Sequence, residues 1–229
     1  MLNSYKKSTN NKTLENGFSI IELIIVLLII SIISVIALMS FKGEKKYLAD
    51  SQSYQIIDLI QEARQRSLTQ RETMRVEINQ TRNIIRLISE NEPGNADDDK
   101  EVRSVKLQDS KYVVIGTKPQ NVANPPSDLS INPLLSFKKS VHPLSKSDTV
   151  ATLRFVRTGK VLDAGSNAIG DNSTVTGATI YVWMPDYSSN NQPLATGSII
   201  RAITVQGVSG MSRYFKCPVN NGKCENWIQ

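Results

Sequence analysis

Residues 17–41 read GFSIIELIIVLLIISIISVIALMSF, an apolar run in which Glu22 is the only ionisable side chain. As a helix, the 24 residues from Phe18 to Phe41 would be roughly 36 Å long, which is enough to cross the apolar core of a bilayer. The run is longer than the core of a secretory signal peptide, and no small-residue cleavage site follows it. Because lipid offers no partners to backbone polar groups, a helix is the expected conformation. We therefore expect residues 18–41 to be a transmembrane helix.

The position of Glu22 within this run indicates more than an anchor. An acidic residue at the centre of a membrane helix costs about 2.5–3.5 kcal/mol, and less near an end, so it requires a partner. Cleavage after Gly17 would create a new α-amino group on Phe18, four residues before Glu22. The amine of one copy could then pair with the carboxylate of a neighbouring copy and offset the cost of burial. The alternative is an uncleaved membrane anchor in which the glutamate has no such role.

The heptapeptide from Gly17 to Leu23, GFSIIEL, resembles the processing signal of type IV prepilins and type II secretion pseudopilins. This resemblance implies that a membrane-embedded prepilin peptidase cleaves between Gly17 and Phe18 and methylates the new amino group of Phe18. It also implies that Glu22, the fifth residue of the mature chain, takes part in subunit assembly. Residues 1–17, which are polar and rich in Asn, Ser and Lys, would then be the leader peptide.

The charge around the apolar run does not fix its orientation in a membrane. Three lysines precede the run and three follow it closely, so the positive-inside count is nearly balanced. The formal charge of the whole chain, +6, is compatible with an anionic partner but does not argue for one.

The two cysteines provide a better indication of compartment. Cys217 and Cys224 flank the segment PVNNGK, whose Pro, Asn and Gly residues favour a turn. No further Cys or His lies nearby to complete a zinc site, so we expect no metal. We expect a disulfide, which indicates an oxidising compartment such as a periplasm and stabilises a short loop by about 2–3 kcal/mol. The alternative is a pair of reduced thiols without a structural role.

Helical periodicity continues beyond the apolar run. Apolar or small side chains recur at helical spacing through residues 42–72, at Ile56, Leu59, Ile60, Ala63 and Ser67. No proline occurs between Phe18 and Arg71. We therefore expect one helix of about 50 residues, apolar all round at first and amphipathic later, whose second half packs on a globular domain.

Residues 73–229 show strand patterns separated by turn-rich segments. The predicted strands are 73–79, 83–89, 102–107, 112–116, 152–157, 178–184, 198–205 and 211–215. We expect residues 102–107 and 112–116 to form a strand pair, and residues 118–136, 164–177 and 185–197 to be loops. The acidic segment 90–101 lacks the spacing of an EF-hand, and we interpret it as a solvated loop. The expected fold class is α+β, with an antiparallel sheet packed on the long helix.

Later motifs refine the family resemblance. The segment from Gln61 to Arg64 is similar to the ARxxA region of FimT/GspH-type minor pilins and pseudopilins, with Ser67 at a position where Ala is usual. Residues 155–159 and 201–210 resemble the later conserved strands of the same proteins, and the C-terminal cysteine pair is closer to FimU-like minor pilins. Some FimT-like members bind DNA through a G-R-x-R motif. The corresponding stretch here, from Gly210 to Arg213, is GMSR, which lacks the first arginine.

The sequence does not indicate an enzyme or a cofactor. The single histidine, His142, precedes Pro143, and no nucleophile motif, phosphate-binding loop or metal cluster accompanies it. We interpret it as a structural or surface residue, and we assign any chemistry at the N-terminus to the peptidase that would process the chain.

Three functions remain as hypotheses. The first is a minor pilin or pseudopilin that starts or caps a filament of a type IV pilus or type II secretion system, with the prepilin peptidase, other pilins and the inner membrane as partners. The second is a DNA-binding minor pilin, with phosphate contacts from Arg201, Arg213, Lys216 and Lys223. The third is a single-pass protein of the inner membrane that displays a periplasmic domain without joining a filament.

Overall fold

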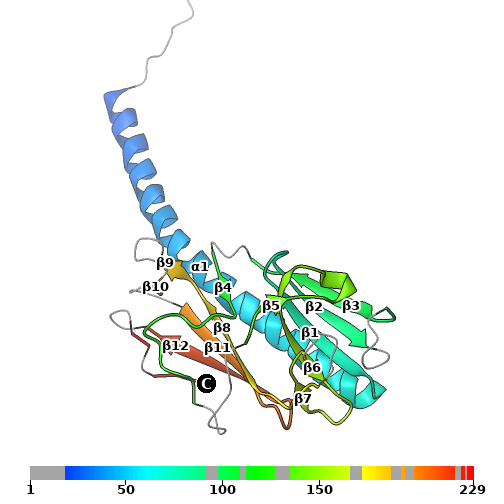
Figure 1. Cartoon of the computed structure of the whole chain (residues 1–229). Coiled ribbons are helices and arrows are strands. Elements are labelled where there is room, and N and C mark those ends of the chain that lie inside the picture. Colours follow the sequence, from blue (N-terminus) through cyan, green and yellow to red (C-terminus); the bar gives the residue numbers. More distant parts are fainter. Residues whose placement is uncertain are drawn as a thin grey trace, which may run out of the picture. The chain divides into compact units, whose positions relative to one another are not determined.

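The computed structural model describes residues 19–90, 97–108, 112–126, 135–165, 172–186, 192–193, 199–219, 223–224 and 226–229. For residues 36–46, 186 and 192–193, only the backbone is described. The chain divides into two compact units, residues 1–43 and residues 44–229. One helix, α1 (Ile20–Gln70), contributes residues to both units, as the unbroken helical pattern predicted (Figure 1).

In the first unit, α1 begins at a capping serine. The carbonyl of Ser19 accepts from the backbone N–H groups of Glu22 (3.0 Å) and Leu23 (3.2 Å), and the Ser19 hydroxyl lies 3.4 Å from the N–H of Ile21. The hydroxyls of Ser31 and Ser34 donate to carbonyls one turn earlier, so these polar groups are satisfied within the helix. In the described part of the chain, no helical stretch has both the length and the hydropathy of a membrane span.

In the second unit, α1 is amphipathic. The predicted inward positions, Ile56, Leu59, Ile60, Ala63 and Ser67, are all fully buried. The four apolar side chains of this set pack in one apolar core with side chains from both of the main sheets. The helix ends at Gln70, and the next residue, Arg71, has a φ of 57°, in the left-handed region.

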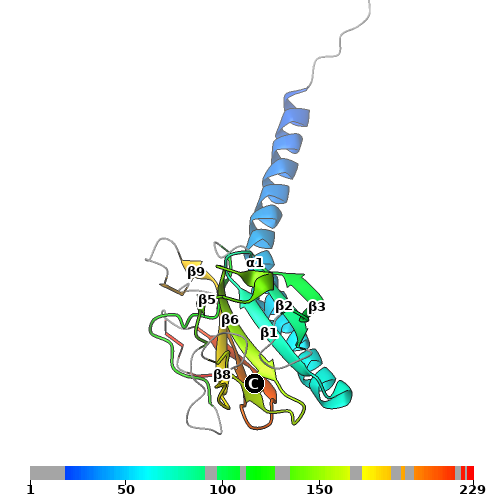
Figure 2. The same ribbon diagram turned by 45° about the vertical axis from the view of Figure 1, so that its right-hand side comes forward.

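The strands of the second unit form two main antiparallel sheets and a short hairpin. The first sheet has the order β3-β2-β1-β6-β5, with β7 also paired to β6, and the second has the order β12-β11-β8-β4. The single sheet expected from the sequence is therefore two sheets, both of which contribute to the core on α1 (Figures 1 and 2). The first sheet comprises β1 (Thr73–Asn79), β2 (Ile84–Glu90), β3 (Lys100–Lys106), β5 (Lys138–Lys139), β6 (Thr149–Phe155) and β7 (Val161–Leu162). The second sheet comprises β4 (Val114–Ile115), β8 (Ala178–Trp183), β11 (Ile199–Val205) and β12 (Ser212–Pro218).

Two connections differ from the sequence-based expectation. Residues 102–107 and 112–116 do not form a strand pair, because β3 pairs with β2 whereas β4 pairs with β8 in the other sheet. The predicted loop 185–197 contains a two-residue hairpin of β9 (Pro185–Asp186) and β10 (Gln192–Pro193). The pairing of β4 with β8 joins distant segments, which local periodicity does not specify, whereas the β9–β10 hairpin is local and too short to give a strand pattern.

The first sheet carries charged side chains on its face away from the core, yet these side chains are buried. Arg75 and Arg154 both donate to the carboxylate of Glu90, and Arg86 donates to Glu77 at 2.6 Å. The short 3₁₀ helix η1 (Pro143–Ser145) covers part of this face, since Leu144 O accepts from Arg86 and the Ser145 hydroxyl donates to Glu77. Pairing and hydrogen bonding make the burial of these charges tolerable.

Candidate functional site

The N-terminal end of α1 is the first candidate site. Glu22 lies in the first helical turn, where the free N–H groups and the helix dipole favour a negative charge. Its side chain is exposed. The predicted cleavage position, Gly17 and Phe18, lies outside the described residues, so the structure does not give its geometry.

The helix that follows Glu22 has an apolar surface on every side. All Ile, Leu and Val side chains from Ile20 to Val35 are between 45% and 82% exposed. Within the described residues these side chains have no covering segment. A contiguous apolar surface of this size marks contact with lipid or with another protein, because monomeric soluble proteins rarely leave one uncovered. This exposed apolar surface begins next to one carboxylate, that of Glu22.

Comparison with protein-family models gives one match at this segment. The model described as "Prokaryotic N-terminal methylation motif" matches residues 12–38. The chain carries the methylation motif of type IV prepilin-like proteins. Comparison with curated proteins gave no match, and neither did comparison with solved structures. The matched region contains Gly17, Phe18 and Glu22 and most of the exposed apolar surface.

The second candidate site is the set of four cations considered for DNA contact. Arg201 is only 5% exposed, and its Nε donates to Asp50 Oδ1 at 2.5 Å. Arg201 is two residues from both Ile199 and Ile203, so it shares their face of β11, which packs against the core. A buried arginine paired in this way is not presented to a nucleic acid.

The other three cations do not form one surface with Arg201. Lys216 and Lys223 are exposed, and Arg213 is partly exposed. Arg213 and Lys216 are three residues apart in β12, so they lie on opposite faces of the strand. The Lys216 ammonium lies 5.6 Å from the centre of the Tyr214 ring, in the range of a cation–π contact.

A cluster that the sequence did not reveal joins α1 to the second sheet. Asp50 of the helix accepts hydrogen bonds from Arg201 of β11 and, at 3.0 Å, from the hydroxyl of Tyr214 in β12. Burial alone would raise the pKa of Asp50, but the hydrogen bond and charge of Arg201 outweigh it and hold the pKa below its usual value. Burial and the Asp50 carboxylate raise the pKa of the Tyr214 hydroxyl. An arginine at an apolar position of a strand was the available signal for this cluster.

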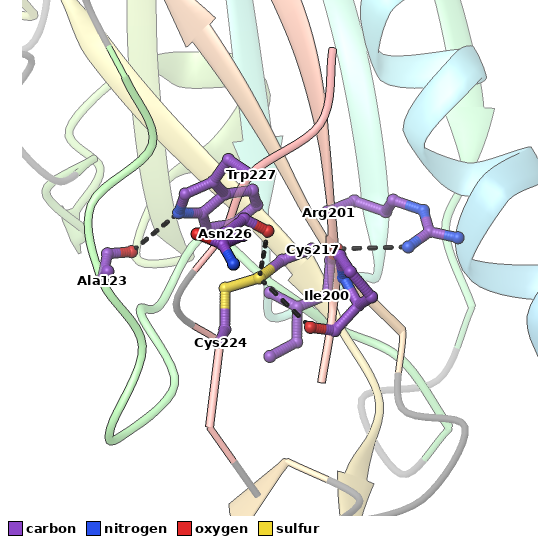
Figure 3. The surroundings of a disulfide bond; sticks show 8 residues. Ala123, Ile200, Arg201, Cys217, Cys224, Asn226 and Trp227 are labelled. Carbon is purple, nitrogen blue, oxygen red and sulfur yellow. Dashed lines mark hydrogen bonds between the residues drawn. A yellow bond between two sulfur atoms is a disulfide. The ribbon is translucent and has the colours of Figure 1, made fainter. Parts of the chain in front are cut away.

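The third candidate site is the C-terminal disulfide. Cys217 in β12 is bonded to Cys224, so the cysteine pairing expected from the sequence is present (Figure 3). Cys224 forms a parallel bridge with Val122, and its carbonyl accepts from the N–H of Ala123 at 3.2 Å. Trp227 donates from Nε1 to Ala123 O at 3.1 Å, as Figure 3 shows. The disulfide thus joins β12 to a tail that also contacts residues 122–123.

His142 has a structural environment. It is fully buried, its Nδ1 accepts from the N–H of Leu144, and its Nε2 lies 2.6 Å from Asp99 Oδ2. Since Nδ1 is the acceptor, Nε2 carries the proton that is donated to Asp99. Among the described residues, no three His, Cys, Asp or Glu side chains are grouped as a metal site.

Proposed function

We propose that this chain is a minor pilin or pseudopilin, a filament subunit that helps to start or cap assembly of a type IV pilus or a type II secretion pseudopilus. The observation that carries the proposal is an exposed apolar helix headed by Glu22 within a prokaryotic N-terminal methylation motif. The role is structural: peptide hydrolysis and methylation would be performed on this chain by a prepilin peptidase.

Assembly would depend on a charge pair made only after processing. Removal of residues 1–17 would leave an α-amino group on Phe18, and the apolar helix would hold the subunit in the inner membrane until it enters the filament. Two unit charges about 4 Å apart attract by about 4 kcal/mol at an effective dielectric constant near 20. This exceeds the cost of about 2.5–3.5 kcal/mol for an acidic residue within a membrane helix. Pairing of the Phe18 amine of one subunit with Glu22 of another would therefore favour entry into the helical bundle.

The test removes the carboxylate in two ways, of which Glu22→Gln keeps the shape of the side chain. Glu22→Gln and Glu22→Ala should still be processed and remain in the membrane fraction, because the apolar helix is intact. We expect their level in sheared filaments to fall by about tenfold or more, since the loss of roughly 1.4 kcal/mol already changes an equilibrium tenfold. Ser31→Ala, in the same helix, is the control and should enter filaments normally. Normal incorporation of Glu22→Gln would contradict the proposed assembly step.

The DNA-binding alternative has less support from the observed geometry. Arg201 forms a buried ion pair with Asp50, and Arg213 and Lys216 lie on opposite faces of β12.

The disulfide favours an oxidising compartment for the second unit, which agrees with a periplasmic location.

A further inference from the structure

Two tight turns of the second unit pack against the C-terminal end of α1 (Figures 1 and 2). The turns are residues 156–160, between β6 and β7, and residues 206–211, between β11 and β12. Leu68 of the helix lies against the first turn, since a Cβ on Gly159 would be 3.2 Å from its side chain. Arg64 reaches the second turn and donates from Nε to Ser209 O at 2.8 Å. Side chains from all three segments therefore share one surface of the second unit.

Three apolar side chains of this surface are exposed. Val208 is 65% exposed, Met211 is 52% exposed and Leu68 is 40% exposed. Val208 and Met211 belong to the same tight turn, whose first and last residues are joined by a hydrogen bond of 2.9 Å from Gln206 N to Met211 O. The two side chains therefore stand on a projecting turn, which suits insertion into a partner better than it suits enclosure of a small ligand.

Three cations lie beside these apolar side chains. Arg157 and Lys160 are exposed residues of the first turn, and Arg64 is partly exposed. Among the described residues, no carboxylate lies within ion-pair distance of any of the three. Glu62 and Glu72, the acidic residues that flank this part of α1, have other partners. The six residues that form this surface, here called the turn patch, are Arg64, Leu68, Arg157, Lys160, Val208 and Met211.

A projecting apolar turn beside unpaired cations matches the chemistry of an anionic lipid surface. Aliphatic and thioether side chains can enter the boundary between headgroups and acyl chains, while neighbouring cations stay at the level of the headgroup phosphates. Single-stranded nucleic acids are held largely by aromatic side chains on which the bases stack, and the turn patch contains no aromatic residue. The apolar part of the patch would thus gain from contact with lipid and would have no role on a nucleic acid.

We propose that the turn patch binds the surface of an anionic membrane. Val208 and Met211 insert between the headgroups, and Arg64, Arg157 and Lys160 lie beside the phosphates. This contact is separate from the apolar helix of the first unit and does not depend on the filament role proposed above. Because the cations are at the surface, binding weakens as the salt concentration rises.

The test uses the full-length chain, held by its apolar helix in nanodiscs of phosphatidylcholine. Its binding to separate vesicles is measured by co-sedimentation, with vesicles either of pure phosphatidylcholine or of equal parts phosphatidylglycerol and phosphatidylcholine. At about 50 mM salt, where surface charges are weakly screened, we expect the affinity for the anionic vesicles to be at least about tenfold higher. Equal affinity for the two kinds of vesicle, or no binding to either, would overturn the proposal.

The insertion step has its own variant, chosen to leave the charge unchanged. Val208→Ser/Met211→Ser should bind anionic vesicles at least about tenfold more weakly, because apolar area is no longer buried in the membrane. Val141→Ser is the matched control, since Val141 is 61% exposed but lies outside the turn patch, and it should bind as the parent does. Undiminished binding of the double variant would show that the turn does not insert and would contradict the proposal.

The cations are tested by a second pair of variants with equal changes in net charge. Arg157→Gln/Lys160→Gln should lose at least about tenfold in affinity for anionic vesicles, whereas Lys100→Gln/Lys139→Gln, which removes two exposed lysines of the first sheet, should lose much less. An unchanged midpoint of urea-induced unfolding shows that each variant is folded. Equal losses in the two variants would indicate attraction by net charge alone, against the proposal.

Two further probes distinguish lipid from other anionic partners. A DNA duplex and poly-glutamate are offered to the same nanodiscs at the same salt concentration. We expect both to bind the parent chain more weakly than the anionic vesicles do, since neither offers an apolar layer to Val208 and Met211. Tighter binding of either probe, lost in Arg157→Gln/Lys160→Gln, would assign the turn patch to a nucleic acid or to an acidic protein and would overturn the proposal.

Discussion

Asp50 is the side chain on which the attachment of α1 to the second sheet depends. Its carboxylate is the ion-pair partner of Arg201, whose side chain is 6% exposed, and it also accepts from Tyr214. Replacement by Asn removes the negative charge and leaves the arginine buried without a counter-charge. We expect Asp50→Asn to lower the free energy of unfolding by about 2 kcal/mol at pH 7, measured by urea titration of the full chain in detergent.

An exposed ion pair provides the matched control. Arg103 bonds to Asp58 and Glu62, but its side chain is 44% exposed, so Arg103→Ala should change the free energy of unfolding by less than about 1 kcal/mol.

The effect of Asp50→Asn on stability should also depend on pH in a known direction. Because the folded-state pKa of Asp50 lies below its ordinary value of 3.8, its contribution is complete above that value and is lost as the pH falls through the folded pKa. The stabilities of Asp50→Asn and the parent should therefore converge on acidification, and a constant difference down to pH 3 would refute this role.

The C-terminal end of α1 is fixed by two tight turns. Gly210 has φ +64°, and a Cβ placed on it would lie 2.5 Å from the carbonyl oxygen of Gly159. Arg64 of the helix donates to Ser209 O at 2.8 Å, so the helix and both turns are packed together. We expect Gly210→Ala to destabilise the chain by about 2–4 kcal/mol, through backbone strain and a clash that neither turn can relieve by moving a side chain. The measurement is the midpoint of urea-induced unfolding, which should fall while the slope of the unfolding free energy against urea concentration stays unchanged.

The control for this prediction lies in the same turn. Val208 is 65% exposed, so Val208→Ala should stay within about 0.5 kcal/mol of the parent. If Gly210→Ala were as stable as Val208→Ala, the close approach of the two turns would not be a feature of the native chain.

The elements with strong local signals were predictable from the sequence. The absence of proline and the apolar spacing indicated a helix through residues 18–72, and α1 extends from Ile20 to Gln70. The alternating pattern at 73–79 gave β1 without error, and the pattern at 178–184 gave β8 to within one residue. At the candidate assembly segment, Gly17, Phe18 and Glu22 were apparent because the motif is short and contiguous.

Features that depend on distant segments could not be predicted in the same way. The division into two sheets follows from which strands pair, and β4 is too short to indicate its partner β8. Arg75 has the alternation of a solvent-facing position, and Glu90 was expected at the start of a solvated loop. Their side chains are nevertheless only 1% and 3% exposed, and Glu90 pairs with both Arg75 and Arg154. Arg201 was interpreted as a surface cation for the same reason: a single sequence does not show that Asp50, 151 residues earlier, faces it.

The central claim for the whole molecule is that the chain is processed and methylated for assembly. The measurement that tests it most directly is the intact mass of the protein extracted from membranes of cells with an active prepilin peptidase. The observed mass should lack residues 1–17, include one additional methyl group and be two hydrogens lighter because Cys217 and Cys224 are joined. A full-length, unmethylated mass would contradict it, since Glu22 would then have no processed amine as its partner and the chain would be a simple anchored domain.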